Sequence, residues 1–145
     1  MINLGQSVFL KNRTRKTVLK LPSSLEYIRK ASSKVLKALS SLDVDGDTLF
    51  DIRLCVEEAV RNAIVHGNRS DKSRFVRVAY WIKDDKLSVE VEDEGGGFIH
   101  GDVADPTADD NIMKNSGRGV FLIKKLMDLV EYNDTGNKIK MVKYL

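Results

Sequence analysis

The sequence predicts an α+β fold, a two-layer α/β sandwich in which helices cover a sheet. The 145 residues are the length of one domain, and 42% hydrophobic against 31% charged residues is the balance of a globular chain. The expected strands come in hairpins and the expected helices are grouped apart from them, which favours this arrangement over a parallel βαβ sheet. Neither a P-loop string nor a complete dinucleotide-binding glycine motif is present. Residues 1–145 are therefore predicted to form a single domain.

The first half of the chain predicts strand followed by two helices. Residues 7–21 read as one or two short strands, and the Pro-Ser-Ser that follows them is a helix-start signal. Apolar residues then recur at mostly helical spacing over 25–39. After a turn, a second helix is expected over about 48–66, and Gly67 is a normal C-terminal signal for it.

The second half predicts two hairpins on either side of a third helix. Strands are expected over 75–82 and 86–93, joined by a short polar turn. Residues 94–116 are polar and rich in glycine and aspartate, with little apolar content. The third helix is expected from 120 to about 129, and a closing hairpin over 130–144.

Charge and cysteine content restrict the class of protein. The 24 lysines and arginines exceed the 21 aspartates and glutamates by three, too small an excess for direct nucleic-acid binding by bulk charge. One cysteine, Cys55, excludes an internal disulfide framework and points to a reducing cytoplasm. No apolar run is long enough for a signal peptide or for the ~18 residues of a spanning helix, so no membrane is expected.

The densest basic stretch leaves two interpretations open. Its residues are Lys11, Arg13, Arg15 and Lys16. They form either a solvated strand edge, where charges also block edge-to-edge pairing, or a docking surface for an acidic partner.

The helix expected over 48–66 presents two polar side chains at the flank of its apolar stripe. Glu58 and Asn62 are four residues apart, about 40° around the helix axis. A carboxylate and a carboxamide one turn apart suit a hard cation such as Mg²⁺, or a base beside a metal ligand. Solvated helix surface is the alternative. His66, at the end of this helix, is interpreted as a capping residue.

The strand expected over 86–93 ends on a carboxylate that points inward. Leu87, Val89 and Val91 alternate with polar residues, and Asp93 has the parity of the apolar set. Burying this carboxylate unpaired would cost several kcal/mol, so a donor must reach it. Three glycines, 95–97, follow and would let a flat ligand or another backbone approach closely. The alternative is an ordinary strand end in a glycine-rich turn.

A long polar segment separates these glycines from the third helix. Residues 98–116 exceed the length at which structureless loops become uncommon in compact domains, and such loops are usually functional or disordered. Gly117-Arg118-Gly119 then precedes the helix, where free backbone N–H groups and the positive dipole end suit a phosphate. A flexible entry to the helix is the alternative.

The order of these motifs carries more information than any one of them. A helix with E-x-x-x-N, a strand ending D-x-G-x-G, a long lid and G-x-G at a helix start resemble the GHKL ATPase superfamily. More narrowly, EEAVRNAIVHGN, VEDEGGGF, NSGRGVFLIKKLMD and the tail GNKIKM resemble the small bacterial anti-sigma factor serine/threonine-protein kinases. The resemblance covers about residues 15–145. It implies a histidine-kinase-like ATPase fold with a mixed, mostly antiparallel sheet covered by three helices, binding ATP and Mg²⁺.

The resemblance also implies roles for individual residues. Asn62 would coordinate the Mg²⁺ that bridges the ATP phosphates, and Glu58 would activate the hydroxyl of a substrate serine. Asp93 would accept a hydrogen bond from the adenine amino group. Gly95 and Gly97 would make room for the base.

Phosphate binding under a lid at about 98–116 is implied for four consecutive residues: Gly117, Arg118, Gly119 and Val120. One departure concerns the last strand, where the family often has Gly-Thr and this chain has Gly136-Asn137. An asparagine can still form hydrogen bonds there, so the site is expected to persist.

The function implied is that of an ATP-binding anti-sigma factor that phosphorylates a serine or threonine on a small antagonist protein. Its partners would be a sigma factor, the antagonist, or both, in a bacterial partner-switching system. One alternative is a nucleotide-gated partner-binding switch with little or no kinase activity. Another is the catalytic module of a sensor kinase, which the absence of dimerisation helices and a phospho-acceptor histidine argues against. The oligomeric state is left open, with a homodimer among the alternatives.

Overall fold

The structure, a computed structural model, describes residues 14–96 and 115–145. Several predictions fall outside these residues: the strand character of 7–13, the basic residues Lys11 and Arg13, Gly97, and the proposed lid up to residue 114.

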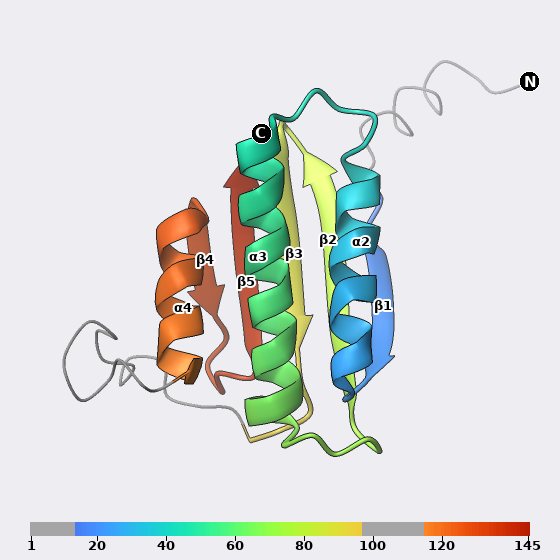
Figure 1. Cartoon of the computed structure of the whole chain (residues 1–145), viewed down its shortest axis with the longest axis vertical. Helices are drawn as coiled ribbons and strands as arrows, with labels where there is room; N and C mark the ends of the chain where they lie inside the picture. The colour runs from blue at the N-terminus through green and yellow to red at the C-terminus, as the bar shows by residue number, and fades with distance from the viewer. Residues whose placement is uncertain (1–13, 97–114) are drawn as a thin grey trace, which may run out of the picture.

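Five strands form one sheet in the order β1-β2-β3-β5-β4 (Figure 1). Their bounds are Thr17–Pro22 for β1, Phe75–Lys83 for β2, Lys86–Glu92 for β3, Leu129–Tyr132 for β4 and Lys138–Tyr144 for β5. All four pairings among these described strands are antiparallel, so the sheet is more uniform here than the mixed one expected. Both predicted hairpins are confirmed.

The helices lie together on one face of this sheet, in front of it in Figure 1. They are α2, Ile28–Ala38, preceded by a 3₁₀ turn at Leu25–Tyr27; α3, Gly46–Asn62, continued by a π-helical turn at Ala63–Gly67; and α4, Asn115–Leu126. The predicted two-layer α+β sandwich with three covering helices is confirmed.

The third helix differs from its prediction at both ends. It begins at Asn115 instead of Val120, so Gly117–Val120 lie inside its first turns and not before it. The polar residues and glycines of this start carry no apolar periodicity, and the sequence pattern therefore hid it. At the other end, Leu129 belongs to β4, where it pairs with Val142.

Helix α3 has the predicted apolar stripe and is the central element of the core. Ile52, Cys55, Val56, Ala59 and Val60 are each at most 3% exposed. The helix begins where the Asp45 side chain accepts a hydrogen bond from Thr48 N at 2.8 Å, an N-cap that satisfies a free N–H of the first turn. On the sheet, Leu87, Val89 and Val91 of β3 are buried on the same side, as their alternation predicted.

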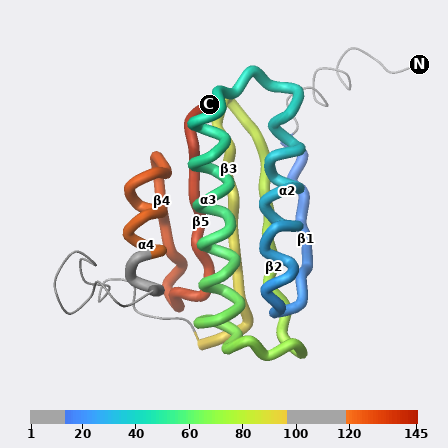
Figure 2. The backbone as a smooth tube through the Cα atoms, in the orientation of Figure 1, coloured from blue at the N-terminus to red at the C-terminus, as the bar shows by residue number. Residues whose placement is uncertain are grey.

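Four chain segments meet at one end of the molecule. The C-terminal end of α3, the end of β3, the β4–β5 turn and the N-terminal part of α4 lie at the lower end of Figure 2, and the chain's C-terminus lies at the opposite end. Residues far apart in the sequence are therefore neighbours there.

Candidate functional site

A pocket lies at this end, between the helices and the sheet. Its apolar walls and few polar groups are typical of a small-molecule site. The lining residues come from α3 and the turn after it, from β3, from α4 and from the β4–β5 hairpin: Ala59, Asn62, Ala63, His66, Gly67, Val91, Asp93, Val120, Ile123, Tyr132, Gly136, Asn137, Lys138 and Ile139.

Asp93 lines the pocket on the helix-covered side, where its parity in the strand predicted it. Its Oδ1 accepts a hydrogen bond from Gly95 N at 2.8 Å. Burial raises the pKa of Asp93, and the Gly95 N–H offsets part of that effect. Within the described residues no lysine or arginine forms an ion pair with this carboxylate.

Two glycines let the backbone close around Asp93. A Cβ on Gly67 would lie 2.2 Å from Asp93 Cγ, and a Cβ on Gly95 would lie 2.0 Å from the Gly67 carbonyl oxygen. The space beside Gly95 is thus occupied by Gly67. Gly95 therefore has a packing role, which differs from its predicted role of making room for the base. A Cβ on Gly96 would meet nothing within 4 Å.

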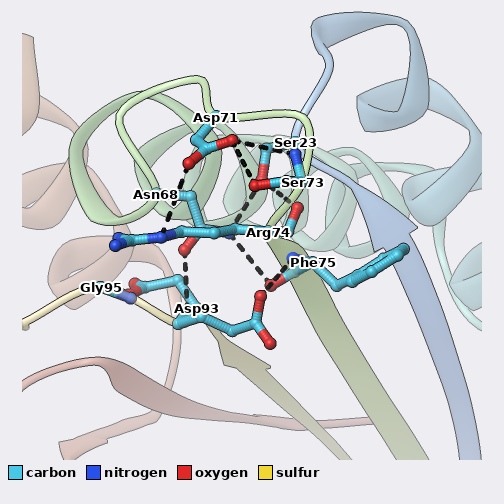
Figure 3. Close-up of polar contacts among 9 residues, drawn as sticks. Ser23, Asn68, Asp71, Ser73, Arg74, Phe75, Asp93 and Gly95 are labelled. Carbon is cyan, nitrogen blue, oxygen red and sulfur yellow. Dashed lines mark hydrogen bonds and ion pairs between the residues drawn. The ribbon is translucent and has the colours of Figure 1, made fainter.

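Asn68 is a buried polar residue that sequence reasoning missed. It directly follows Gly67, the predicted C-terminal signal of the helix, and it is 0% exposed. Its Nδ2 donates to Ser23 Oγ at 2.8 Å and to the Phe75 carbonyl at 3.0 Å, and its Oδ1 accepts from Glu94 N at 2.7 Å (Figure 3). An asparagine two residues after a helix-ending histidine has no local signature for such a role.

Asn137 holds Asp93 from the other side. Its main-chain oxygen accepts from Asp93 N at 2.9 Å, and its Nδ2 donates to the Asp93 carbonyl at 3.0 Å. Asn137 therefore bonds to the protein backbone at this place, and the expectation that the ligand site persists with asparagine here stays a prediction.

The structure distinguishes the two adjacent glutamates of α3. Glu57 accepts from Ser32 Oγ at 2.6 Å and from Arg53 Nε at 3.1 Å, so its carboxylate joins α3 to α2. Glu58 faces α4 instead: a Cβ on Gly119 would lie 2.8 Å from Glu58 Oε2 and 3.3 Å from Asn62 Nδ2. The predicted pair Glu58 and Asn62 therefore lies together beside the first turns of α4.

The remaining predicted residues are placed as follows. Asn62 and Val120 line the pocket, whereas the lining residues do not include Glu58. Gly117 and Arg118 belong to the first turn of α4.

Asn62 and Glu58 offer one amide oxygen and one carboxylate. Among the described residues no group of three or more histidines, cysteines or acidic residues could hold a metal alone. Mg²⁺ does not need such a cage, because it keeps several waters and takes its other ligands from one or two protein groups and the substrate phosphates. The donor set fits a Mg²⁺ that arrives with a nucleotide.

Comparison with known proteins gives the family. Residues 21–143 match the histidine kinase-like ATPase domain. The chain belongs to this family, whose members carry the fold described above.

Two curated relatives are similar over most of their length. The chain is 31% identical over 140 residues to the serine-protein kinase RsbW of Listeria monocytogenes serovar 1/2a, covering 90% of this chain and 87% of that protein. It is 28% identical over 135 residues to the serine-protein kinase RsbW of Staphylococcus aureus strain JH9, covering 88% and 85%.

A solved structure has the same fold. The RsbU and RsbW domains of Rv1364c from Mycobacterium tuberculosis match with a TM-score of 0.61 at 15% identity, over 91% of this chain and 35% of that longer one. In the part of the chain that the structure describes, every helix is too short or too polar to span a membrane.

Proposed function

We propose that this chain is an ATP-dependent anti-sigma factor that phosphorylates a serine or threonine on a small antagonist protein. One observation carries the proposal: the ATPase pocket holds Asp93 at the end of β3, and Asn62 connects this pocket to Glu58. Glu58 does not line the pocket itself but lies next to Asn62, which does, beside the first turns of α4. The two similar RsbW proteins, whose name states a serine-protein kinase activity, support this reading.

The residues divide the work between binding and transfer. Asp93 accepts a hydrogen bond from the amino group of adenine, and the apolar walls of the pocket take the ring. Asn62 would hold Mg²⁺ through its amide oxygen, and the bound cation would supply positive charge against the phosphates. Gly117, in the first turn of α4, offers a backbone N–H group and the positive end of the helix dipole to the phosphates, and Arg118, Gly119 and Val120 follow it in the helix.

Glu58 acts on the incoming hydroxyl. Its carboxylate accepts the hydroxyl proton while the serine oxygen bonds to the γ-phosphorus of ATP. The bond from that phosphorus to the bridging oxygen breaks, and ADP leaves. Its neighbour Glu57 is held by Ser32 and Arg53 at 2.6 and 3.1 Å, whereas the ion pair of Glu58, with Arg61 Nε, is longer, at 3.9 Å.

The partners proposed are a sigma factor and its antagonist, in the cytoplasm. The compartment is supported by Cys55, which is fully buried and unpaired, as expected for a chain in a reducing environment. A homodimer is compatible with this function and is checked by measuring the mass in solution.

A transfer assay tests the kinase. The protein is incubated with Mg²⁺, γ-labelled ATP and small candidate antagonists encoded by neighbouring genes, and label is followed onto the partner. Glu58→Gln should bind ATP normally and transfer about 10²–10⁴-fold more slowly, the usual contribution of a general base. Glu57→Gln, which can still accept from Ser32, is the matched control and should transfer normally.

Two outcomes would change the proposal. Transfer by Glu58→Gln at the wild-type rate would show that Glu58 is not the base. Normal ATP binding with no transfer to any partner would favour the nucleotide-gated switch.

The metal assignment needs a separate measurement. Asn62→Ala should weaken ATP binding in Mg²⁺ and have little effect in EDTA, because Asn62 acts through the cation. Calorimetric titration with and without Mg²⁺ checks this, and equal affinity of both proteins in Mg²⁺ would contradict it.

A further inference from the structure

Asp93, the residue proposed to bind the adenine amino group, lies just beyond the end of strand β3. Strand β3 ends at Glu92, and beyond it one main-chain bond, from Asp93 N to the Asn137 carbonyl at 2.9 Å, continues the pairing with the neighbouring segment. The direction of the Asp93 carboxylate then depends on whatever holds its main chain. Two asparagine side chains, from segments distant in the sequence, do so.

Asn137 binds both main-chain polar groups of Asp93. It accepts from Asp93 N through its own carbonyl at 2.9 Å and donates to the Asp93 carbonyl through Nδ2 at 3.0 Å. Its Oδ1 accepts from Asn133 Nδ2 and from Thr135 Oγ1, each at 2.7 Å. Two donors on Oδ1 leave one orientation for this amide, with Nδ2 toward Asp93.

Asn68 holds the next residue. Its Oδ1 accepts from Glu94 N at 2.7 Å, and both its N–H groups are used on Ser23 Oγ and the Phe75 carbonyl. The Glu94 carboxylate accepts in turn from Phe75 N at 2.6 Å. In Figure 3 Asn68 lies between the β1–β2 edge of the sheet and the Asp93–Gly95 segment. The chain after Asp93 is thereby tied to the ends of β1 and β2.

We propose that Asn137 and Asn68 are positioning residues that aim Asp93 and so set the selectivity of this site for adenine. The inference rests on the proposed function. A hydrogen bond weakens steeply as its angle departs from linearity, so a carboxylate on a loosened main chain loses its preference for an amino donor. Contacts to ribose and phosphates do not pass through Asp93 and should persist.

The test compares two nucleotides that differ at the position Asp93 would read. ATP has an amino group on the six-membered ring where ITP has an oxo group, and calorimetric titration in Mg²⁺ gives both dissociation constants. Wild type should bind ATP at least about tenfold more tightly than ITP, a difference of about 1.4 kcal/mol. Asn137→Ala should lose most of its ATP affinity advantage and bind ITP as wild type does.

Asn68→Asp provides a second variant. It keeps the size of the side chain and the acceptor for Glu94, but it loses both N–H donors and should also reduce the ATP preference. Because Asn68 is fully buried this variant could fail to fold, whereas Asn137 is only half-buried. Ser73→Ala is the control: Ser73 bonds to Asp71 in the same cluster and touches neither asparagine.

Each result separates the inference from the proposed function. An unchanged ATP-to-ITP ratio in Asn137→Ala would overturn the inference, as would equal losses for both nucleotides with a lower melting temperature. Failure of wild type to bind ATP would instead refute the proposed function, and the inference with it. Collapse of the ratio in both Asn137→Ala and Asn68→Asp, with Ser73→Ala unchanged, would establish it, because Asn68 does not line the pocket.

Discussion

Two carboxylates of strand β3 and its end, three residues apart, have opposite surroundings. Glu90 lies on the face of the sheet away from the helices, where Lys16 Nζ and Lys138 Nζ approach its two oxygens at 3.0 and 3.1 Å. Burial alone would raise the pKa of Glu90, but the two ammonium groups outweigh it and lower that pKa. Asp93 has no such partners among the described residues, and burial raises its pKa.

This difference in surroundings indicates different roles for Glu90 and Asp93. Glu90 is neutralised by its own chain and stabilises the sheet. Asp93 is held in place through its main chain and one Gly95 N–H, and among the described residues its carboxylate, which lines the pocket, has no ion pair. A half-buried carboxylate that is fixed but not neutralised is typical of a group kept for a ligand.

The largest expected effect comes from the glycines that shape the Asp93 side of this comparison. Gly95→Ala would bring a Cβ to 2.0 Å from the Gly67 carbonyl oxygen, a backbone atom that cannot move aside cheaply. We expect the free energy of unfolding to fall by about 1–3 kcal/mol, the usual cost of overpacking, and ATP binding to be lost. Gly96→Ala, with nothing within 4 Å of its new Cβ, is the matched control and should change little. Urea unfolding and calorimetric titration measure both.

Removing the charge of Asp93 should separate stability from binding. In Asp93→Asn the amide oxygen can still accept the hydrogen bond from Gly95 N. The NH₂ group then faces the adenine amino group, so that two donors meet and no hydrogen bond forms. ATP affinity should fall about ten- to a hundredfold, the cost of about 1–3 kcal/mol for an unpaired group in a desolvated pocket. Without ligand the variant should be more stable than wild type at neutral pH, since the penalty of burying a charge is removed. A less stable apo protein would show that the carboxylate serves the fold.

Glu90→Gln should have the opposite effects: it should lower the stability of the protein slightly and leave ATP binding unchanged. Removing its charge leaves two lysines without their partner, and both are well solvated, with side chains 51% and 35% exposed. The free energy of unfolding should fall by about 1 kcal/mol or less, and less still in high salt. ATP affinity should not change, and a clear loss of affinity would show that this face of the sheet communicates with the pocket.

The smallest expected effect is the pH dependence of the free energy of unfolding, which compares Asp93 and Glu90 directly. The raised pKa of Asp93 means that its ionised form is costly in the folded state, and this cost is relieved as pH falls through that pKa toward 3.8. The lowered pKa of Glu90 means that its contribution is present above 4.5 and is lost as pH falls through its folded value.

The two variants should therefore differ from wild type with opposite signs at neutral pH and converge on it in acid. The Asp93→Asn difference should shrink below the raised folded pKa of Asp93 and vanish near 3.8, and the Glu90→Gln difference should shrink only below 4.5. Urea unfolding between neutral pH and about pH 3 measures the free energies of unfolding, and differences of the same sign for the two variants at neutral pH would contradict the assignment.

Local periodicity in the sequence determined a large part of the fold and some of the site. The apolar stripe of α3, the alternation of β3 and the turn residues of the hairpins depend on neighbours within a few positions, so the elements could be predicted. The same regularity predicted the inward face of Asp93 and the shared face of Glu58 and Asn62.

Tertiary structure alone decided how Asp93 is held. Asn68 bonds to Glu94, 26 positions away in the sequence, and Asn137 bonds to Asp93, 44 positions away. Gly67 packs against Gly95, which is also too far away in the sequence for a local pattern to predict the contact. Hydrogen bonds and close contacts of this kind depend on where the fold brings separate segments together. The sequence by itself therefore indicated which side chains could act, and the packing of the sheet end decided which of them are free to do so.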